Sequence, residues 1–243
     1  MKLTFAAVQV GNYAGRGQEY AAKLFAGVRA NMPSWVKLRC VCLTDDPATL
    51  PKDVEALPVL PGISGWWNKL LLFRPGTFKR GERILYSDLD TIFIGDLRDF
   101  NHYSGKFAAM RDPLGYCRIA SSVMAWEAGT LDHIWTKWDE AGRPQFDPHG
   151  DQAWIGAMMS DCDYLQDMLP RQIVSFKKDC WLQGRIPADA SILMFHGAPR
   201  PHQCRAPYIM ELWNRDVITG YSNNAQRERN VWEQQADLNV SVS

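Results

Sequence analysis

The sequence predicts an α/β protein with a Rossmann-like mixed, mostly parallel sheet, flanked by helices and forming a single domain. Three observations support this fold class. Residues 3–10 are almost continuously apolar, as expected for a strand covered on both faces. Residues 21–28 then show helical spacing, and residues 38–44 return to a β-rich run. The length of 243 residues is also sufficient for one large core.

Further elements are expected in order along the chain. Residues 66–73 predict a short buried helix, and residues 83–87 predict a third strand. Two helices should follow, one behind Thr130 as N-cap and one behind Gly150-Asp151. Their Trp and Met stripes are interpreted as core packing. Other strand-like segments lie at 106–110, 122–126, 173–176 and 191–195.

Composition excludes several classes of protein. Lys+Arg 27 balances Asp+Glu 27 without a basic run, which argues against nucleic acid or an anionic membrane surface as the source of affinity. No apolar stretch approaches the roughly 20 residues of a spanning helix. The 6 cysteines contain no C-x-x-C pair and suggest neither a disulfide scaffold nor a zinc site. We therefore expect a cytoplasmic protein without a transmembrane segment.

The strongest chemical signal is the stretch ERILYSDLDTIFIGDL at 82–97, where a β-run ends in Asp88 and Asp90. On an extended backbone, side chains two residues apart point the same way, so the carboxylates need a cation or a donor network. Mg²⁺ and Mn²⁺ take such oxygen ligands and bridge them to phosphates. Open α/β sheets also bind ligands at the carboxyl ends of their strands. The alternative is that both aspartates merely cap or turn the chain.

Three further segments stand in order around this motif: WNKL at 67–70, GDQ at 150–152 and MFHGAPRP at 194–201. With the aspartates, they make the chain resemble nucleotide-sugar-dependent glycosyltransferases of the GT-A fold. Within that group it is similar to the glycogenin-like and galactosyltransferase-like retaining enzymes. The matches are spread over residues 3–202, and the D-x-D stretch is the specific one among them.

The resemblance implies a nucleotide-diphosphate donor, a UDP-sugar, and a Mn²⁺ or Mg²⁺ ion held by Asp88 and Asp90. From the residues alone, Lys69 could instead reach solvent, Arg200 could be a surface residue, and Tyr13 could cover the sheet edge rather than stack on uracil. The residues implied around the donor are Val8, Gln9, Val10, Asn12, Tyr13, Lys69, Asp88, Leu89, Gly197 and Arg200.

The chain departs from the family pattern at two places. Met194 stands where the family has its metal-binding histidine, and His196 follows two residues later on the same face of a strand. His196 is therefore the expected third metal ligand, with a structural histidine as the alternative. The segment Ala120-Ser121-Ser122 stands where the family has Asn-x-Gly, which leaves the identity of the sugar open.

Asp151 and Gln152 are the expected catalytic residues. They would lie across the sugar from the metal and stabilise positive charge at the anomeric carbon or orient the acceptor. The alternative for Asp151 is a helix N-cap, and Asp147 is a weaker catalytic candidate. The implied reaction moves a sugar, with retention of configuration, to an acceptor hydroxyl of a glycan, lipid-linked sugar, protein or small molecule.

We expect residues 1–221 to form the glycosyltransferase-like domain, with 1–97 as its nucleotide-binding half and 98–221 as its acceptor and metal-completing half. Residues 222–243 are polar and predict a C-terminal helix or tail. Two other functions fit parts of the sequence. A haloacid dehalogenase-like phosphatase also has D-x-D after a strand, but it requires Thr or Val where Ile92 stands. A silent sugar-nucleotide or glycan-binding module would explain Met194 and Ala120.

Overall fold

Strand β1 (Lys2–Gln9) lies inside a seven-stranded sheet in the computed structural model, which describes residues 2–145 and 148–215. The strand order is β3-β2-β1-β4-β7-β6-β8. Pairing is parallel for β1–β2, β1–β4, β2–β3 and β6–β8, and antiparallel for β4–β7 and β6–β7. The predicted mixed, mostly parallel sheet is therefore confirmed. The other strands of this sheet are β2 (Lys37–Thr44), β3 (Glu55–Pro58), β4 (Arg83–Ser87), β6 (Phe107–Arg111), β7 (Ile119–Glu127) and β8 (Asp163–Tyr164).

Both faces of β1 are covered, as its continuous apolar run predicts. Phe5 and its neighbours at odd positions pack in a cluster with helix α1 (Gly17–Asn31). Ala6 lies in a second cluster on the opposite face, with η3 (Gly65–Phe73), α2 (Asp132–Glu140) and α3 (Gly150–Met158). The alternation of side chains along a strand thus sorts one sequence run into two cores.

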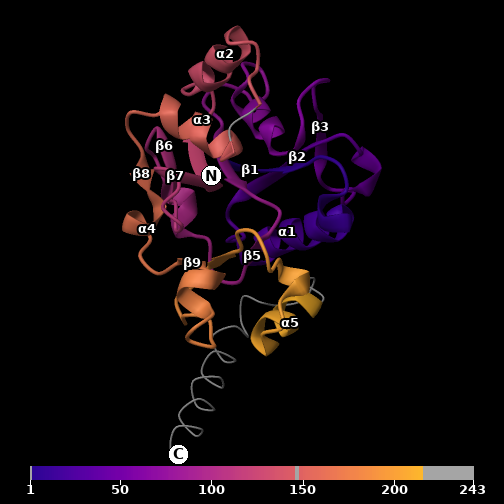
Figure 1. Ribbon diagram of the computed structural model, residues 1–243, viewed down its shortest axis with the longest axis vertical. Helices are drawn as coiled ribbons and strands as arrows, with labels where there is room; N and C mark the ends of the chain where they lie inside the picture. The colour runs from indigo at the N-terminus through magenta and orange to yellow at the C-terminus, as the bar shows by residue number, and fades with distance from the viewer. Residues whose placement is uncertain (1, 146–147, 216–243) are drawn as a thin grey trace, which may run out of the picture.

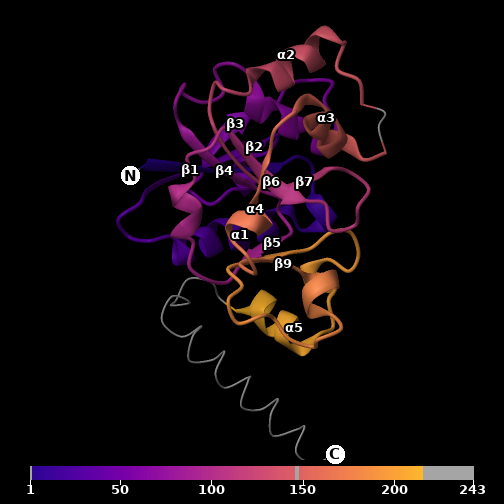
Figure 2. The ribbon, with the colours of Figure 1, turned by 90° about the vertical axis from the view of Figure 1, so that its left-hand side faces the viewer.

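A second, three-stranded sheet has the order β5-β10-β9. The sequence predicts strands at 173–176 and 191–195 but does not separate them from the main sheet. The structure corrects this by placing them in a sheet of their own with β5. The chain turns immediately after β4, so that β5 pairs antiparallel with β10 and faces α1. In Figures 1 and 2 this sheet and α5 lie toward one end of the molecule, and α2 lies at the other. The bounds are β5 (Thr91–Phe93), β9 (Ile173–Ser175), β10 (Ile192–Met194) and α5 (Pro207–Asn214).

Several local predictions differ from the structure. Residues 65–73 are helical but form a 3₁₀ helix. Thr130 does not cap α2, because its hydroxyl donates to the Glu127 carbonyl while Leu131 occupies the N-cap position. Helix α3 already begins at Gly150, so Asp151 lies in its first turn instead of capping it. The predicted tail at 222–243 lies outside the described residues.

Shorter helical segments complete the described chain. They are η1 (Tyr13–Gly15), η2 (Pro47–Thr49), η4 (Asp99–His102), α4 (Leu165–Met168), the π-helix η5 (Phe176–Cys180) and η6 (Pro201–Gln203). Among the helices of residues 2–145 and 148–215, none has both the length and the apolar character needed to cross a membrane.

Replacing Phe5 with Ala tests the core that joins the two sheets. The Phe5 ring is fully buried and makes edge contacts with Phe25 of α1 and Phe93 of β5, at centroid distances of 5.6 and 5.5 Å. We expect the free energy of unfolding to fall by about 3–5 kcal/mol in urea titrations, because a large cavity forms. Leu182→Ala, at a side chain 90% exposed, should change it by less than about 0.5 kcal/mol. Equal losses in both variants would contradict this packing.

Candidate functional site

The turn that follows β4 carries both aspartates of the D-x-D stretch. The extended backbone ends at Ser87, and the Thr91 amide donates to the Asp88 carbonyl across a tight turn at 3.3 Å. The prediction that Asp88 and Asp90 share an extended backbone is therefore wrong. Their position at the carboxyl end of a sheet strand is as predicted. Because of the turn, the two carboxylates have different partners.

Asp88 belongs to a cluster centred on Lys69. The Lys69 Nζ lies 3.0 Å from Asp88 Oδ1 and 2.9 Å from Asp151 Oδ2. The Ser121 hydroxyl accepts a hydrogen bond from Lys69 and donates one of 2.6 Å to Asp151. The Tyr86 hydroxyl donates to Asp88 Oδ1 at 2.5 Å. Residues from η3, β4, β7 and α3 thus meet around one ammonium group.

Burial shapes the charges of this cluster. Burial alone lowers the pKa of Lys69, but the Asp151 and Asp88 carboxylates outweigh it and raise the pKa above its ordinary value. Burial also raises the pKa of Asp151, which the Lys69 ammonium opposes. Lys69 is 4% and Asp151 is 5% exposed, so neither has water to replace its partner. Lys69 therefore pairs inward and does not reach solvent.

The start of α3 depends on Gly150. This residue has φ +62°, and a Cβ there would lie 2.3 Å from the Trp66 Nε1. Glycine adopts this backbone conformation without strain and leaves room for the indole ring. The close contact sets Asp151, in the first helical turn, next to η3 and its Lys69.

Asp90 has a separate set of partners. Its Oδ2 accepts from the Tyr13 hydroxyl at 2.8 Å and from Arg200 Nη1 at 3.3 Å. The Arg200 guanidinium also lies over the Tyr13 ring, 4.4 Å from its centroid. Burial and the neighbouring Asp88 raise the pKa of Asp90 to about 8, and the long, single Arg200 contact does not offset this. Asp90 is thus a buried carboxyl whose negative charge is incompletely compensated.

His196 lies just beyond β10, next to the D-x-D turn. The preceding residue, Phe195, donates its amide to the Asp90 carbonyl at 3.3 Å. The His196 Nε2 lies 2.7 Å from the Ser175 hydroxyl, while its buried Nδ1 has no hydrogen-bond partner among the residues that the structure describes. Met194, at the family's histidine position, is buried in the core.

The residues after β1 take several roles. Gln9 is buried and donates to the Thr49 hydroxyl at 2.7 Å. The Asn12 side-chain Oδ1 accepts from the Gly17 amide and so supports the start of α1. Val8 packs against the core below η3, and Val10 is half-buried. Of this group, the structure brings only Tyr13 into side-chain contact with the acidic site.

The remaining predicted residues are less closely tied to the two acidic clusters. Leu89 has its side chain in the core. Gly197 is exposed, and Gln152 is half-buried in the first turn of α3. Asp147 lies outside the described residues.

Sequence reasoning missed three polar residues that organise the site. Tyr86 precedes Asp88 by two positions on β4, and this spacing was a usable signal. Ser121 lies in the segment where the family has Asn-x-Gly, so its divergence was visible but its contact with Asp151 was not. Ser175 ends β9 and gave no signal, because its partner His196 is distant in the sequence.

The carboxylates fit a divalent cation. Asp90 is a hard oxygen donor, and a bound cation would offset the cost of burying its charge. For His196, a free ring nitrogen with the other nitrogen hydrogen-bonded is the usual state of a metal-binding histidine. Within residues 2–145 and 148–215, however, no three His, Cys, Asp or Glu side chains are grouped so that they could hold a metal ion. The structure therefore does not assemble Asp88, Asp90 and His196 into one ligand set.

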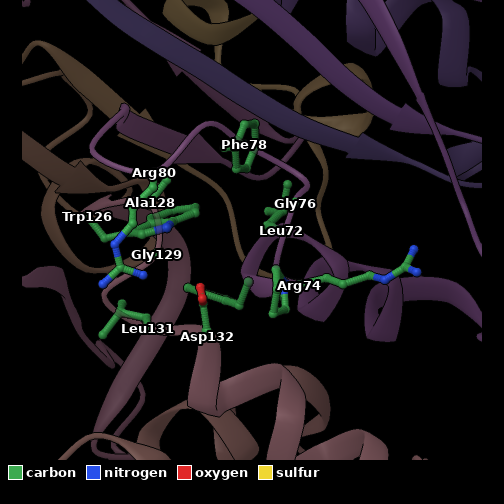
Figure 3. Close-up of a pocket in the computed structure, with 12 residues that line it drawn as sticks. Leu72, Arg74, Gly76, Phe78, Arg80, Trp126, Ala128, Gly129, Leu131 and Asp132 are labelled. Atoms are coloured by element: carbon green, nitrogen blue, oxygen red, sulfur yellow. The ribbon is translucent and has the colours of Figure 1, made fainter.

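A cavity of about 280 Å³ lies away from this site. It opens where β7 ends near Trp126, whereas Asp88 follows the opposite end of the adjacent strand β4. Figure 3 shows the Arg74 side chain extending away from the other labelled residues around the cavity. The predicted site residues do not line it.

Known structures share this fold. The glycosyltransferase GlyE of Streptococcus pneumoniae TIGR4 superposes with a TM-score of 0.62 at 17% identity, over 88% of this chain and 61% of that chain. The galactosyltransferase LgtC, in complex with donor and acceptor sugar analogs, superposes with a TM-score of 0.59 at 14% identity, over 88% of this chain and 95% of that chain. The bifunctional glycosyltransferase WbbM superposes with a TM-score of 0.60 at 11% identity, over 88% of this chain and 51% of that chain. This chain thus spans less than two thirds of the GlyE and WbbM chains.

The sequence matches no protein-family model and no curated protein. The chain has the GT-A glycosyltransferase fold.

Replacing Lys69 with Met tests the central cluster. Asp88 and Asp151 would lose their common cation, so we expect the free energy of unfolding to fall by about 3–5 kcal/mol in urea titrations. Asp151→Asn in the same background should recover part of the loss, because it removes an uncompensated buried charge. The exposed Lys52→Met serves as the control and should change it by less than about 0.5 kcal/mol. A Lys69→Met protein as stable as the control would show that the ammonium is not needed for folding.

Proposed function

We propose that this protein is a metal-dependent glycosyltransferase that moves a sugar from a UDP-sugar to an acceptor hydroxyl, with retention of configuration. The observation that carries the proposal is the pair of carboxylates, Asp88 and Asp90, at the carboxyl end of β4 in a chain with this fold. The incomplete compensation of Asp90 is what a cation-binding carboxylate requires before its ion is bound. The neighbours' names as glycosyltransferases support the same reaction class.

Asp88, Asp90 and His196 would hold the divalent ion, Mn²⁺ or Mg²⁺, after a local rearrangement that brings His196 Nδ1 to the carboxylates. When bound, such an ion supplies Lewis-acid stabilisation of the negative charge on the nucleoside diphosphate leaving group. Asp90 would exchange its contacts with Tyr13 and Arg200 for this ion. Tyr13 and Arg200, once released from Asp90, would be free to contact the donor.

The released groups suit the donor. Arg200 carries a planar fork of N–H donors that matches a diphosphate, and the Tyr13 ring offers a face for a pyrimidine. The backbone of Val8, Gln9, Val10, Asn12, Leu89 and Gly197 would line the nucleotide. In this proposal Lys69 acts indirectly, by holding the carboxylates of Asp88 and Asp151 in place, because its ammonium already pairs with both inside the protein.

Asp151 would carry the catalytic charge. Lys69 and the Ser121 hydroxyl both bind its Oδ2, which fixes the carboxylate in one orientation. A fixed negative charge stabilises the positive charge that develops at the anomeric carbon in the transition state. Gln152, on the next position of α3, would orient the sugar or the acceptor. The acceptor is a hydroxyl-bearing glycan, lipid-linked sugar, protein or small molecule.

Metal-dependent binding of UDP tests the donor site. In calorimetric titrations we expect UDP to bind only when Mn²⁺ or Mg²⁺ is present, and Asp90→Ala to abolish this binding because the ion loses a ligand. Asp96→Ala, at an exposed aspartate beyond β5, serves as the control and should bind UDP normally. Normal binding by His196→Ala would place the third ligand elsewhere.

Three outcomes would overturn parts of the proposed function. UDP binding to the wild-type protein with the same affinity in the presence and absence of metal would exclude a metal-bridged diphosphate. Hydrolysis of an aryl phosphate that is lost in Asp88→Asn would support the phosphatase function instead. Metal-dependent UDP binding without transfer or hydrolysis of any UDP-sugar would indicate the silent binding module.

Asp151→Asn tests the catalytic role. We expect donor hydrolysis or transfer to slow by about 10²–10³-fold, with the Kd for UDP within about threefold of the wild type, because the carboxylate acts on the transition state and not on the nucleotide. Asp161→Asn removes an exposed carboxylate just beyond α3 and should have wild-type kinetics. Weakened UDP binding with an unchanged rate would assign Asp151 to the donor site instead.

A further inference from the structure

The turn that follows η5 displays two large apolar side chains. Trp181 is 54% and Leu182 is 90% exposed, and they are consecutive in the chain. Single exposed apolar residues are common on protein surfaces. A neighbouring pair with a side chain as exposed as Leu182 is a different case, because it leaves a contiguous apolar tip in water. We call residues 177–185 the apolar-basic tip.

The apolar-basic tip is held from below by defined contacts. The Phe176 ring stacks on Phe195, with centroids 4.7 Å apart, and the Trp181 amide donates to the Phe176 carbonyl at 2.8 Å. The Tyr208 hydroxyl of α5 donates to the Cys180 carbonyl at 3.2 Å. Gly184, with φ +66°, closes the turn by donating its amide to the Trp181 carbonyl. The fold therefore presents Trp181 and Leu182 outward from an anchored base.

Three basic residues flank the apolar pair in the sequence. Lys177, Lys178 and Arg185 lie in the tip, and none of them forms an ion pair with a residue of 2–145 or 148–215. The one acid of the tip, Asp179, is committed inward, because its carboxylate accepts from the Ser175 amide at 2.7 Å. Asp189, just beyond the tip, pairs with Arg171. The surface thus combines apolar groups with unpaired positive charge.

We propose that the apolar-basic tip docks onto an anionic phospholipid membrane. Trp and Leu side chains enter the interface between headgroups and acyl chains, while Lys and Arg extend their charged ends to the headgroups. Each cation near such a surface adds electrostatic attraction, and the tip supplies three. A soluble acidic polymer would use the cations but has no place for a Leu side chain that is 90% exposed.

The tip adjoins the candidate site. A Cβ built on Gly197, next to His196, would lie 3.7 Å from the Lys177 Nζ. Docking would therefore bring the site close to the membrane surface. If the proposed function is correct, the acceptor is a lipid-linked sugar carried by that membrane. This consequence rests on the proposed function, whereas docking itself does not.

Sedimentation of the full chain with vesicles tests the docking. We expect binding to phosphatidylcholine vesicles that contain about 30% phosphatidylglycerol, little binding to pure phosphatidylcholine, and loss of binding at about 0.5 M NaCl. The triple variant Lys177→Gln/Lys178→Gln/Arg185→Gln should bind on the order of a hundredfold more weakly, at about fivefold per cation. Trp181→Ser/Leu182→Ser should bind at least about tenfold more weakly.

Matched variants separate the tip from general charge and aromatic exposure. Trp35→Ser removes a Trp that is 53% exposed elsewhere, and Lys37→Gln/Lys52→Gln/Lys79→Gln removes three exposed lysines outside the tip. Both should sediment with vesicles as the wild type does. Thermal unfolding followed by circular dichroism checks that each variant is folded, and metal-dependent UDP binding is measured in parallel.

Three results would overturn the proposal: no binding to the anionic vesicles, equal weakening in the matched variants, or binding to soluble polyglutamate in place of vesicles. The last result would assign the tip to an acidic macromolecule. Failure of UDP binding with normal vesicle binding would overturn the proposed function and leave the docking intact. Normal UDP binding without vesicle binding would do the reverse.

Discussion

The buried ammonium of Lys69 is the interaction on which the site depends. It joins Asp88, Asp151 and Ser121, which come from three different elements and from distant parts of the sequence. A buried charge with hydrogen-bonded partners is stable only when all of them are in place, because losing one leaves another uncompensated. The positions of η3, the end of β4, β7 and the start of α3 are therefore coupled through one group.

This arrangement gives the carboxylates of Asp88 and Asp90 different partners and different roles. Asp88 is neutralised from inside the protein by Lys69, whereas Asp90 accepts a hydrogen bond from the Tyr13 hydroxyl and has a long contact with the Arg200 cation. This division accompanies the tight turn after β4, where the backbone is no longer extended at Asp88 and Asp90. One carboxylate is structurally satisfied, and the other retains the capacity to bind a cation.

Periodicity predicted most of the main sheet, and the reason is local. The apolar run of β1 reports burial on both faces, and the strand–helix–strand alternation that follows it reports parallel pairing. The strands at 173–176 and 191–195 were predicted, but their separation into a small sheet was not, because β5 has only three residues and pairs with β10 about a hundred positions later. The extended backbone expected at Asp88 and Asp90 failed for a similar reason, since a turn that leads into a distant pairing leaves no periodic signal. In the site, Asp88, Asp90 and Lys69 were identified by residue type and order, whereas Ser175 was invisible.

The sequence by itself determined the order of strands and helices, the fold class and the acidic motif, because backbone sterics and side-chain alternation act between neighbours in the chain. Only the tertiary structure decided which charges are paired. It joined Lys69 to Asp151, turned His196 toward Ser175, left Trp181 and Leu182 exposed, and turned the neighbouring Asp179 inward to the Ser175 amide. A balanced composition of 27 basic and 27 acidic residues says nothing of such local asymmetry. Charge pairing depends on distances through space, and those exist only once the chain has folded.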